Sequence, residues 1–459
     1  MKGESYDVVV CGTGITESVL SGLLAMDGMK VLHVDRNSYY GDAGASLNLT
    51  SLWNKFKPNE GVPKALGQNR DWNVDLIPKF VMAYGKLVKL LFKTQVSYYL
   101  RWRAVDGSYV YQWKEGGFFS KEGGKIEKVP SNDKEALGSD LMSLFEKRRC
   151  QKFFKYVQDF EMEDKKTHKK SSPVGKTFRQ WIGDFSLEDN TIDFVGHSVA
   201  LHTTEKFMDR PALETIDKVK LYMESVGRFG ESPFIYPIYG LAGIPEGFSR
   251  KCAVHGGTFM LNQDINKINV EGGSVTSVEG MFEGEQTQTK TKYVIASPSY
   301  INNCGLESKL VKKGKIIRVI CIMDHPIPKT KEKNSVQIII PQKQSKRKND
   351  IYVMQVSSFH NVCKKGYFIA IISTTVETSN PESELKLAYE LIGPVLHKFT
   401  TFEDIYEPAS NDFSDNVFIT KTLDPTSHFE TAAENVLEIY KKITGKDLDL
   451  ENLPEDPTE

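Results

Sequence analysis

The first 34 residues alternate between apolar runs and a helical spacing of apolar positions. Tyr6–Cys11 is a continuous apolar run that predicts a fully buried strand. Val19, Leu20, Leu23 and Leu24 then recur with the period of a helix, and Val31–Val34 predicts a second short strand. This strand–helix–strand order is that of a Rossmann βαβ unit.

The turn between the first strand and the helix carries an altered dinucleotide-binding motif. Gly12 and Gly14 occupy the first two glycine positions, but Glu17 stands at the third, and Asp35 follows where an acid would hold a ribose. Flavoenzymes with this opening usually carry a second glycine pair, and here its place is taken by Gly41 and Asp42. Because two carboxylates would face the diphosphate at the helix N-terminus, we expect a vestigial loop and no bound cofactor.

A helical pattern replaces the strand pattern between residues 131 and 228, apart from a polar linker at 165–176. We therefore predict an α/β fold, an FAD/NAD(P)-binding Rossmann-like domain with mixed sheets (1–130 and 229–459), with an inserted all-α domain (131–228). The apolar positions of its first long helix include Leu144, Phe145, Phe153 and Phe154.

Strand signals return after residue 230. A short helix at Pro245–Val254 is followed by Gly256-Gly257 and a strand at Thr258–Leu261. Gly272-Gly273 predicts a hairpin, and further strands lead to a final helix at Thr431–Ile443. The stretch 112–122 reads either as an elongated hairpin or as an inserted loop.

Composition narrows the class of protein. The chain has 59 Lys and Arg against 60 Asp and Glu, so it lacks the basic excess of a nucleic-acid-binding protein. Charged residues interrupt the N-terminal apolar run, and no stretch reaches the length of a membrane span. The six cysteines are scattered, without metal-ligand spacing. We expect a soluble cytosolic protein with reduced thiols.

Catalytic signals are sparse. Gly175-Lys176-Thr177 resembles the end of a Walker A motif, but position 170 is Lys where that motif needs Gly. His197 lies among apolar neighbours, which favours a hydrogen-bonded core histidine over a catalytic base. The pattern indicates no enzyme and no metal site.

Several long blocks resemble the Rab GDP dissociation inhibitor family, from residue 5 to about 445. They are Gly12–Glu17, His33–Asn37 with Tyr39–Gly41, Arg70–Lys79, Phe145–Arg149, Tyr236–Phe248, Gly256–Asn262 and Thr374–Thr378. The resemblance implies a non-enzymatic protein that binds GDP-loaded, prenylated Rab GTPases, inhibits GDP release and extracts them from membranes. It also implies a cytoplasmic protein that cycles on and off membranes in transient contact with them.

Two alternatives stay open. A Rab escort protein shares these blocks but is typically longer. A flavin-dependent amine oxidase-like enzyme shares the opening motif, and would have to tolerate Glu17 and Asp42.

The resemblance also implies functional residues. The Rab-binding platform maps onto Tyr40, Arg250, Thr258, Phe259 and Met260. Gly243 stands where the family carries a glutamate, so Glu246 either substitutes for it or one contact is missing. Arg228–Phe234 corresponds to a mobile loop that engages membrane-side partners, with Arg228 and Phe234 as its key residues. The helical domain would hold the geranylgeranyl lipid near Leu144, Phe145, Phe153 and Phe154, although these residues could equally form its own core.

Overall fold

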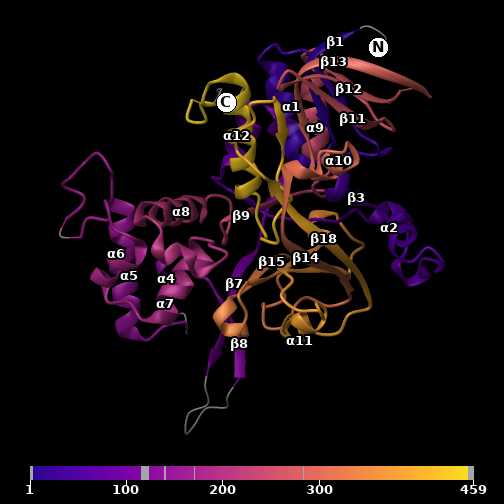
Figure 1. Ribbon diagram of the computed structural model, residues 1–459. Coiled ribbons are helices and arrows are strands. Elements are labelled where there is room, and N and C mark those ends of the chain that lie inside the picture. The colour runs from indigo at the N-terminus through magenta and orange to yellow at the C-terminus, as the bar shows by residue number, and fades with distance from the viewer. Residues whose placement is uncertain (1–3, 115–122, 139–140, 170, 283, 453–459) are drawn as a thin grey trace.

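The computed structural model describes residues 4–114, 123–138, 141–169, 171–282 and 284–452. Two large sheets form its framework, and a group of helices lies beside them (Figure 1). Strands β10, β2, β1, β13, β12 and β11 follow one another across the first sheet, and β19 also pairs with β13. Their bounds are β1 Ser5–Cys11, β2 Val31–Val34, β10 Thr258–Met260, β11 Asp264–Glu271, β12 Ser274–Phe282, β13 Glu285–Ala296 and β19 Val417–Ile419.

The predicted βαβ unit is confirmed. Strand β1 pairs in parallel with β2 and with β13, so its apolar run is buried between neighbours on both sides. Helix α1 (Ile15–Met26) connects β1 to β2 and packs against α9 (Gly243–Val254) and α12 (Glu430–Thr444). These three helices cover one face of the first sheet (Figure 1).

Strand β10 extends the first sheet at the edge beside β2. It pairs in parallel with β2, with Thr258 opposite Leu32 and Phe259 opposite His33. The predicted hairpin joins β11 and β12, and both Gly272 and Gly273 have a positive φ, as a tight turn requires.

The second sheet has the order β18-β14-β17-β16-β15-β7-β8. The hairpin β7–β8 is present, but residues 115–122 at its tip lie outside the described residues, so the two interpretations of 112–122 stay open. The bounds are β7 Gly107–Lys114, β8 Gly123–Lys128, β14 Leu310–Met323, β15 Val336–Ile340, β16 Ile351–Ser357, β17 Phe368–Thr375 and β18 His397–Pro408; helix α11 is Lys386–Ile392.

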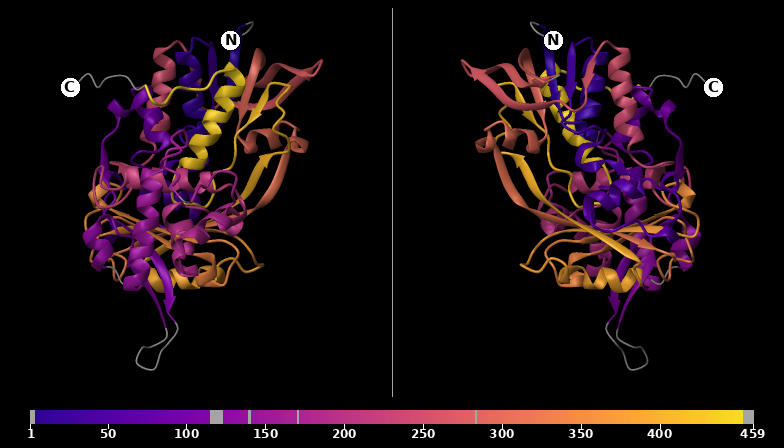
Figure 2. Two further views of the ribbon diagram at one scale, coloured as in Figure 1. Left: turned by 90° about the vertical axis from the view of Figure 1, so that its left-hand side faces the viewer. Right: turned by 90° about the vertical axis from the view of Figure 1, so that its right-hand side faces the viewer.

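Helices α4 to α8 form the group beside the sheets, which we call the helical region (133–225) (Figures 1 and 2). Its described residues contain no strand. Within it, residues Phe194–Val199 form a π-helical turn. Its apolar core is continuous with that beneath α1 and α9. The bounds are α4 Asp133–Gly138, α5 Leu144–Asp159, α6 Phe178–Ile182, α7 Asp189–Asp193 and α8 Ala212–Ser225.

Short elements connect these parts. Strand β9 (Phe234–Pro237) lies between β5 and β6 in a three-stranded sheet near the centre of the molecule. The remaining elements are α2 Leu49–Phe56, α3 Lys86–Lys93, α10 Pro298–Asn303, β3 Ser46–Leu47, β4 Val74–Asp75, β5 Val81–Met82 and β6 Trp102–Ala104. Within the described residues, no helix combines the length and the apolar character needed to cross a membrane.

Candidate functional site

Asp35, the acid expected to hold a ribose, accepts hydrogen bonds from neighbouring residues of the chain. The backbone N–H and the hydroxyl of Thr13 donate to one oxygen of Asp35, at 2.7 and 2.5 Å. The backbone N–H and side-chain amide of Asn37 donate to the other oxygen, at 2.7 and 2.9 Å. Asp35 is fully buried, so its carboxylate serves the glycine loop rather than a nucleotide.

The carboxylate of Glu17 fills the place where phosphate would approach α1. Its side chain is buried, and the Thr420 hydroxyl donates to Oε1 at 2.5 Å. Burial raises the pKa of Glu17 to about 7. Asp42 lies on the same side of the loop, where burial and the charge of Asp35 raise its pKa to about 6.

A cavity of about 350 Å³ remains at this position. Its wall carries four carboxylic acids, Glu17, Asp42, Glu403 and Asp404, with Lys421 beside them. Because a dinucleotide brings two phosphate charges to the helix N-terminus, these side chains do not fit it. The residues argue against flavin or nicotinamide binding in this cavity.

The expected platform residues gather at the β10 edge. Phe259 packs on Tyr40, with ring centroids 6.3 Å apart, and on His33 at 4.5 Å. Burial raises the pKa of Tyr40, and the negative charge of Glu246 raises it further. Thr258 and Met260 point to the opposite face of the sheet, where the Thr258 hydroxyl meets Tyr6.

Helix α9 presents one acid and one base to solvent. Glu246 and Arg250 are exposed and four residues apart, so they lie on one face of the helix. The Arg250 guanidinium stacks over the Tyr99 ring, 4.8 Å from its centroid. Sequence analysis missed Tyr99, and only its place in a Tyr-Tyr pair could have drawn notice.

Gly243, where the resemblance expects a glutamate, begins helix α9. A Cβ at Gly243 would lie 2.8 Å from the Leu100 side chain, so a larger residue there requires Leu100 to shift.

The four expected lipid-site residues divide into two pairs. Leu144 and Phe145, at the start of α5, are 58% and 71% exposed. Phe153 is fully buried and packs on Phe154, with centroids 5.4 Å apart, and on Trp181. In this conformation Phe153 is a core residue of the helical region, and Phe154 is partly buried against that core.

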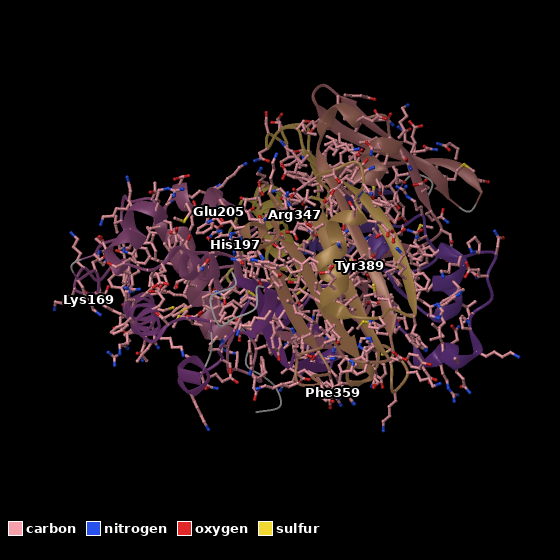
Figure 3. All side chains as sticks on the ribbon, turned by 90° about the horizontal axis from the view of Figure 1, so that it is seen from below. Lys169, His197, Glu205, Arg347, Phe359 and Tyr389 are labelled. Carbon is pink, nitrogen blue, oxygen red and sulfur yellow. The ribbon has the colours of Figure 1, made fainter. Side chains whose placement is uncertain are left out.

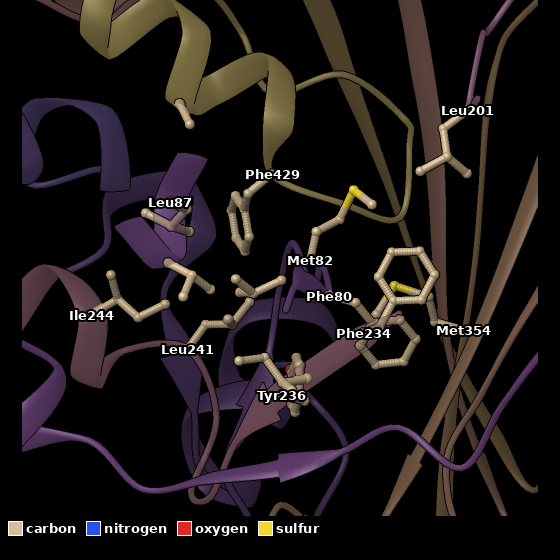
Figure 4. Packing of buried hydrophobic residues seen from close by; sticks show 14 of the residues in the cluster. Phe80, Met82, Leu87, Leu201, Phe234, Tyr236, Leu241, Ile244, Met354 and Phe429 are labelled. Atoms are coloured by element: carbon tan, nitrogen blue, oxygen red, sulfur yellow. The ribbon is translucent and has the colours of Figure 1, made fainter. Parts of the chain in front are cut away.

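The structure corrects the expected position of Phe234. This side chain is fully buried in strand β9, among Phe80 and Met354, rather than in an exposed loop (Figure 4). Arg228 does lie in the preceding loop, where its guanidinium stacks over Tyr84, and Phe229 is the exposed aromatic residue of this loop.

His197 connects the helical region to the second sheet. It sits in the π-helical turn, and its ring nitrogens lie 2.8 Å from Asp350 and 2.9 Å from Glu205 (Figure 3). Lys343 adds contacts to Asp193 at 2.6 Å and to Glu205 at 3.2 Å. Although burial opposes protonation, the two carboxylates prevail and raise the histidine pKa to about 10. His197 is therefore a charged, fully bonded core histidine.

Fold and site together define a Rossmann-like protein in which Asp35 and Glu17 of the glycine-loop region are bonded to other parts of the chain. The family model for GDP dissociation inhibitors matches residues 1–455. The chain belongs to the GDP dissociation inhibitor family.

Relatives match over nearly the whole chain. A Schizosaccharomyces pombe protein, "Probable secretory pathway GDP dissociation inhibitor 1", is 48% identical over 98% of both chains. The Arabidopsis thaliana "Guanosine nucleotide diphosphate dissociation inhibitor 2" is 50% identical over 97% of both. The solved structure of a Rab GDI from Plasmodium falciparum has a TM-score of 0.92 at 47% identity, covering 98% of this chain and all of that one.

More distant structures share the fold alone. An oxidoreductase from Methanosarcina mazei has a TM-score of 0.60 at 14% identity, covering 95% of this chain and 100% of that one. The predicted fold class is confirmed by these matches.

Proposed function

We propose that this protein binds prenylated Rab GTPases in the GDP state, inhibits GDP release and extracts them from membranes for return through the cytoplasm. Family membership supports a GDP dissociation inhibitor, and the Plasmodium Rab GDI supports Rab as the class of GTPase. In this proposal the protein is not an enzyme and needs no cofactor.

The observation that carries the proposal is the composition of the β10 edge. Half-buried aromatic side chains, Tyr40 and Phe259, lie beside an exposed acid and an exposed base, Glu246 and Arg250. Aromatic residues and arginine are the side chains that most often dominate binding energy at protein interfaces. Met260 adds an adaptable apolar contact on the other face of the same strand.

The lipid site belongs to the helical region in this proposal. Burying an isoprenoid chain stabilises a complex by about 0.8 kcal/mol per CH₂ group, so a soluble carrier must offer a comparably apolar surface. Leu144 and Phe145 are exposed apolar side chains on that region, and they supply the entry to such a site. Phe153 and Phe154 would line it only if the helices part.

The test uses membranes that carry prenylated Rab. Purified protein is incubated with membranes whose Rab is loaded with GDP or, in a parallel sample, with GTP. The Rab released to the supernatant is then measured. We expect release from the GDP-loaded membranes alone. The proposal is refuted if equal amounts of Rab are released in the two nucleotide states, or if a well-folded preparation releases no Rab.

A further inference from the structure

Helix α3 carries a row of lysines on one face. Lys86, Lys89 and Lys93 are spaced three and four residues apart, which places them along one side of the helix. The other side is apolar and buried in the core through Leu87, Val88, Leu90 and Leu91. The lysine face is half-buried, with the side chains of Lys86 and Lys89 40% and 17% exposed.

The C-terminal segment lies over these lysines. Residues 447–452, which we call the C-terminal strap, alternate acidic and apolar side chains, with Asp447, Asp449 and Glu451 between Leu448 and Leu450. Both leucines pack against the main hydrophobic core, while the three acids are exposed. The pattern is that of an extended segment held by its leucines, with its carboxylates outward.

The strap pairs directly with the lysine face. Glu451 lies 2.7 Å from the Lys89 ammonium, and Lys93 donates to the backbone carbonyl of Asn452 at 2.9 Å. Lys86 pairs with Glu434 of α12 at 2.7 Å. The Glu451 side chain is 76% exposed and the Lys89 side chain is 17% exposed, so water and salt reach this pair from the carboxylate side. Such contacts are weak enough to exchange.

The surroundings of the lysine face suit a lipid surface. The Tyr84 ring lies within 4.5 Å of Lys89 and 4.8 Å of Arg228, which extends the cationic area. Phe92 and Phe229 are 39% and 55% exposed. Lysine offers a charge without fixed geometry, which suits mobile headgroups better than it suits one shaped protein partner. Exposed aromatic side chains beside basic residues are typical of membrane-surface contacts.

We propose that the lysine face of α3 binds anionic lipid headgroups, and that the C-terminal strap competes with them for Lys89 and Lys93. Glu451 of the strap acts as an internal anion on Lys89 until a charged membrane surface replaces it. The interaction needs no GTPase, so it goes beyond the proposed function and can fail or succeed independently of it.

The test is co-sedimentation of the full chain with vesicles of phosphatidylcholine alone or mixed with phosphatidylserine. Neutralising Lys86, Lys89 and Lys93 to Gln should weaken binding to the mixed vesicles by about fivefold per lysine. A matched control neutralises Lys312, Lys313 and Lys315 on β14, which pair with acids of β18. The control should bind like the unchanged protein.

Two strap variants test the competition. Asp449→Asn with Glu451→Gln removes charge and keeps the leucine anchors, so binding to mixed vesicles should rise several-fold. Leu448→Ser with Leu450→Ser releases the strap and should raise it further, with circular dichroism to confirm folding. The proposal is overturned if the α3 and β14 variants bind alike, or if binding ignores phosphatidylserine. Binding to immobilised polyglutamate without vesicle binding would instead indicate an acidic protein partner.

Discussion

Replacing His197 with glutamine would test whether its ion pairs with Asp350 and Glu205 hold the helical region against the second sheet. The imidazolium contacts Asp350 and Glu205, and both His197 and Asp350 are buried. Its pKa rises from 6.5 to about 10 in the folded state. At about 1.4 kcal/mol per pKa unit, the full contribution is about 5 kcal/mol, and about 4 kcal/mol of it remains at pH 7. Glutamine cannot carry the charge, and it leaves Asp350 without its cation.

The sign of the pH dependence follows from the raised pKa. Below about pH 6.5 the histidine is protonated in both folded and unfolded chains, so its stabilising contribution is complete. Between about pH 6.5 and pH 10 only the folded chain keeps the proton, and the contribution falls by about 1.4 kcal/mol per pH unit. Urea unfolding of both proteins across this range should show the stability difference shrinking as pH rises.

The control is His255→Gln, which changes an exposed histidine at the end of α9. It should alter the free energy of unfolding by less than about 0.5 kcal/mol. If His197→Gln changes the free energy of unfolding as little as the control does, or by an amount independent of pH, the stabilising role of the protonated His197 is refuted. A double-mutant cycle with Asp350→Asn would then show whether the two side chains are coupled at all.

Three further predictions concern the other sites. Arg250→Ala should weaken binding of GDP-loaded Rab by about 1–3 kcal/mol in a titration, and unchanged affinity would exclude Arg250 from the interface. Phe145→Asp should reduce extraction of prenylated Rab from membranes but spare binding of unprenylated Rab; equal loss of both would make Phe145 structural. Because the pKa of Glu17 is raised to about 7, Glu17→Gln should stabilise the fold by about 3 kcal/mol above pH 7. This increase in the free energy of unfolding should vanish near pH 4.5. If urea unfolding shows the same increase at every pH, burial of the Glu17 carboxylate is not its cause.

Much of the fold follows from local patterns. The apolar run of β1, the helical spacing of α1 and the glycine pair of the β11–β12 hairpin each predict their element, because burial and turn geometry act on neighbouring residues. The position of Phe234 did not follow, because an aromatic residue after a polar loop gives no local sign that β5 and β6 enclose it.

Pairings between distant parts of the chain were also beyond prediction. Arg250 on Tyr99 and His197 on Asp350 join segments that the sequence separates by roughly 150 residues. Neither end of such a pair alters the hydrophobic period of its own element. The exposure of Arg250, by contrast, follows from a local pattern, since it depends only on which face of α9 is apolar.

The altered glycine loop holds two buried carboxylates, Asp35 and Glu17, through hydrogen bonds within the protein. In a dinucleotide-binding protein the ligand would occupy the loop donors and the ribose acid, and its loss would leave buried polar groups unpaired. Here Thr13 supplies the donors for Asp35, and Thr420, just after β19, supplies one for Glu17. Both carboxylates therefore have hydrogen-bond donors within the protein, and the contact between Glu17 and Thr420 joins α1 to the C-terminal part of the sheet.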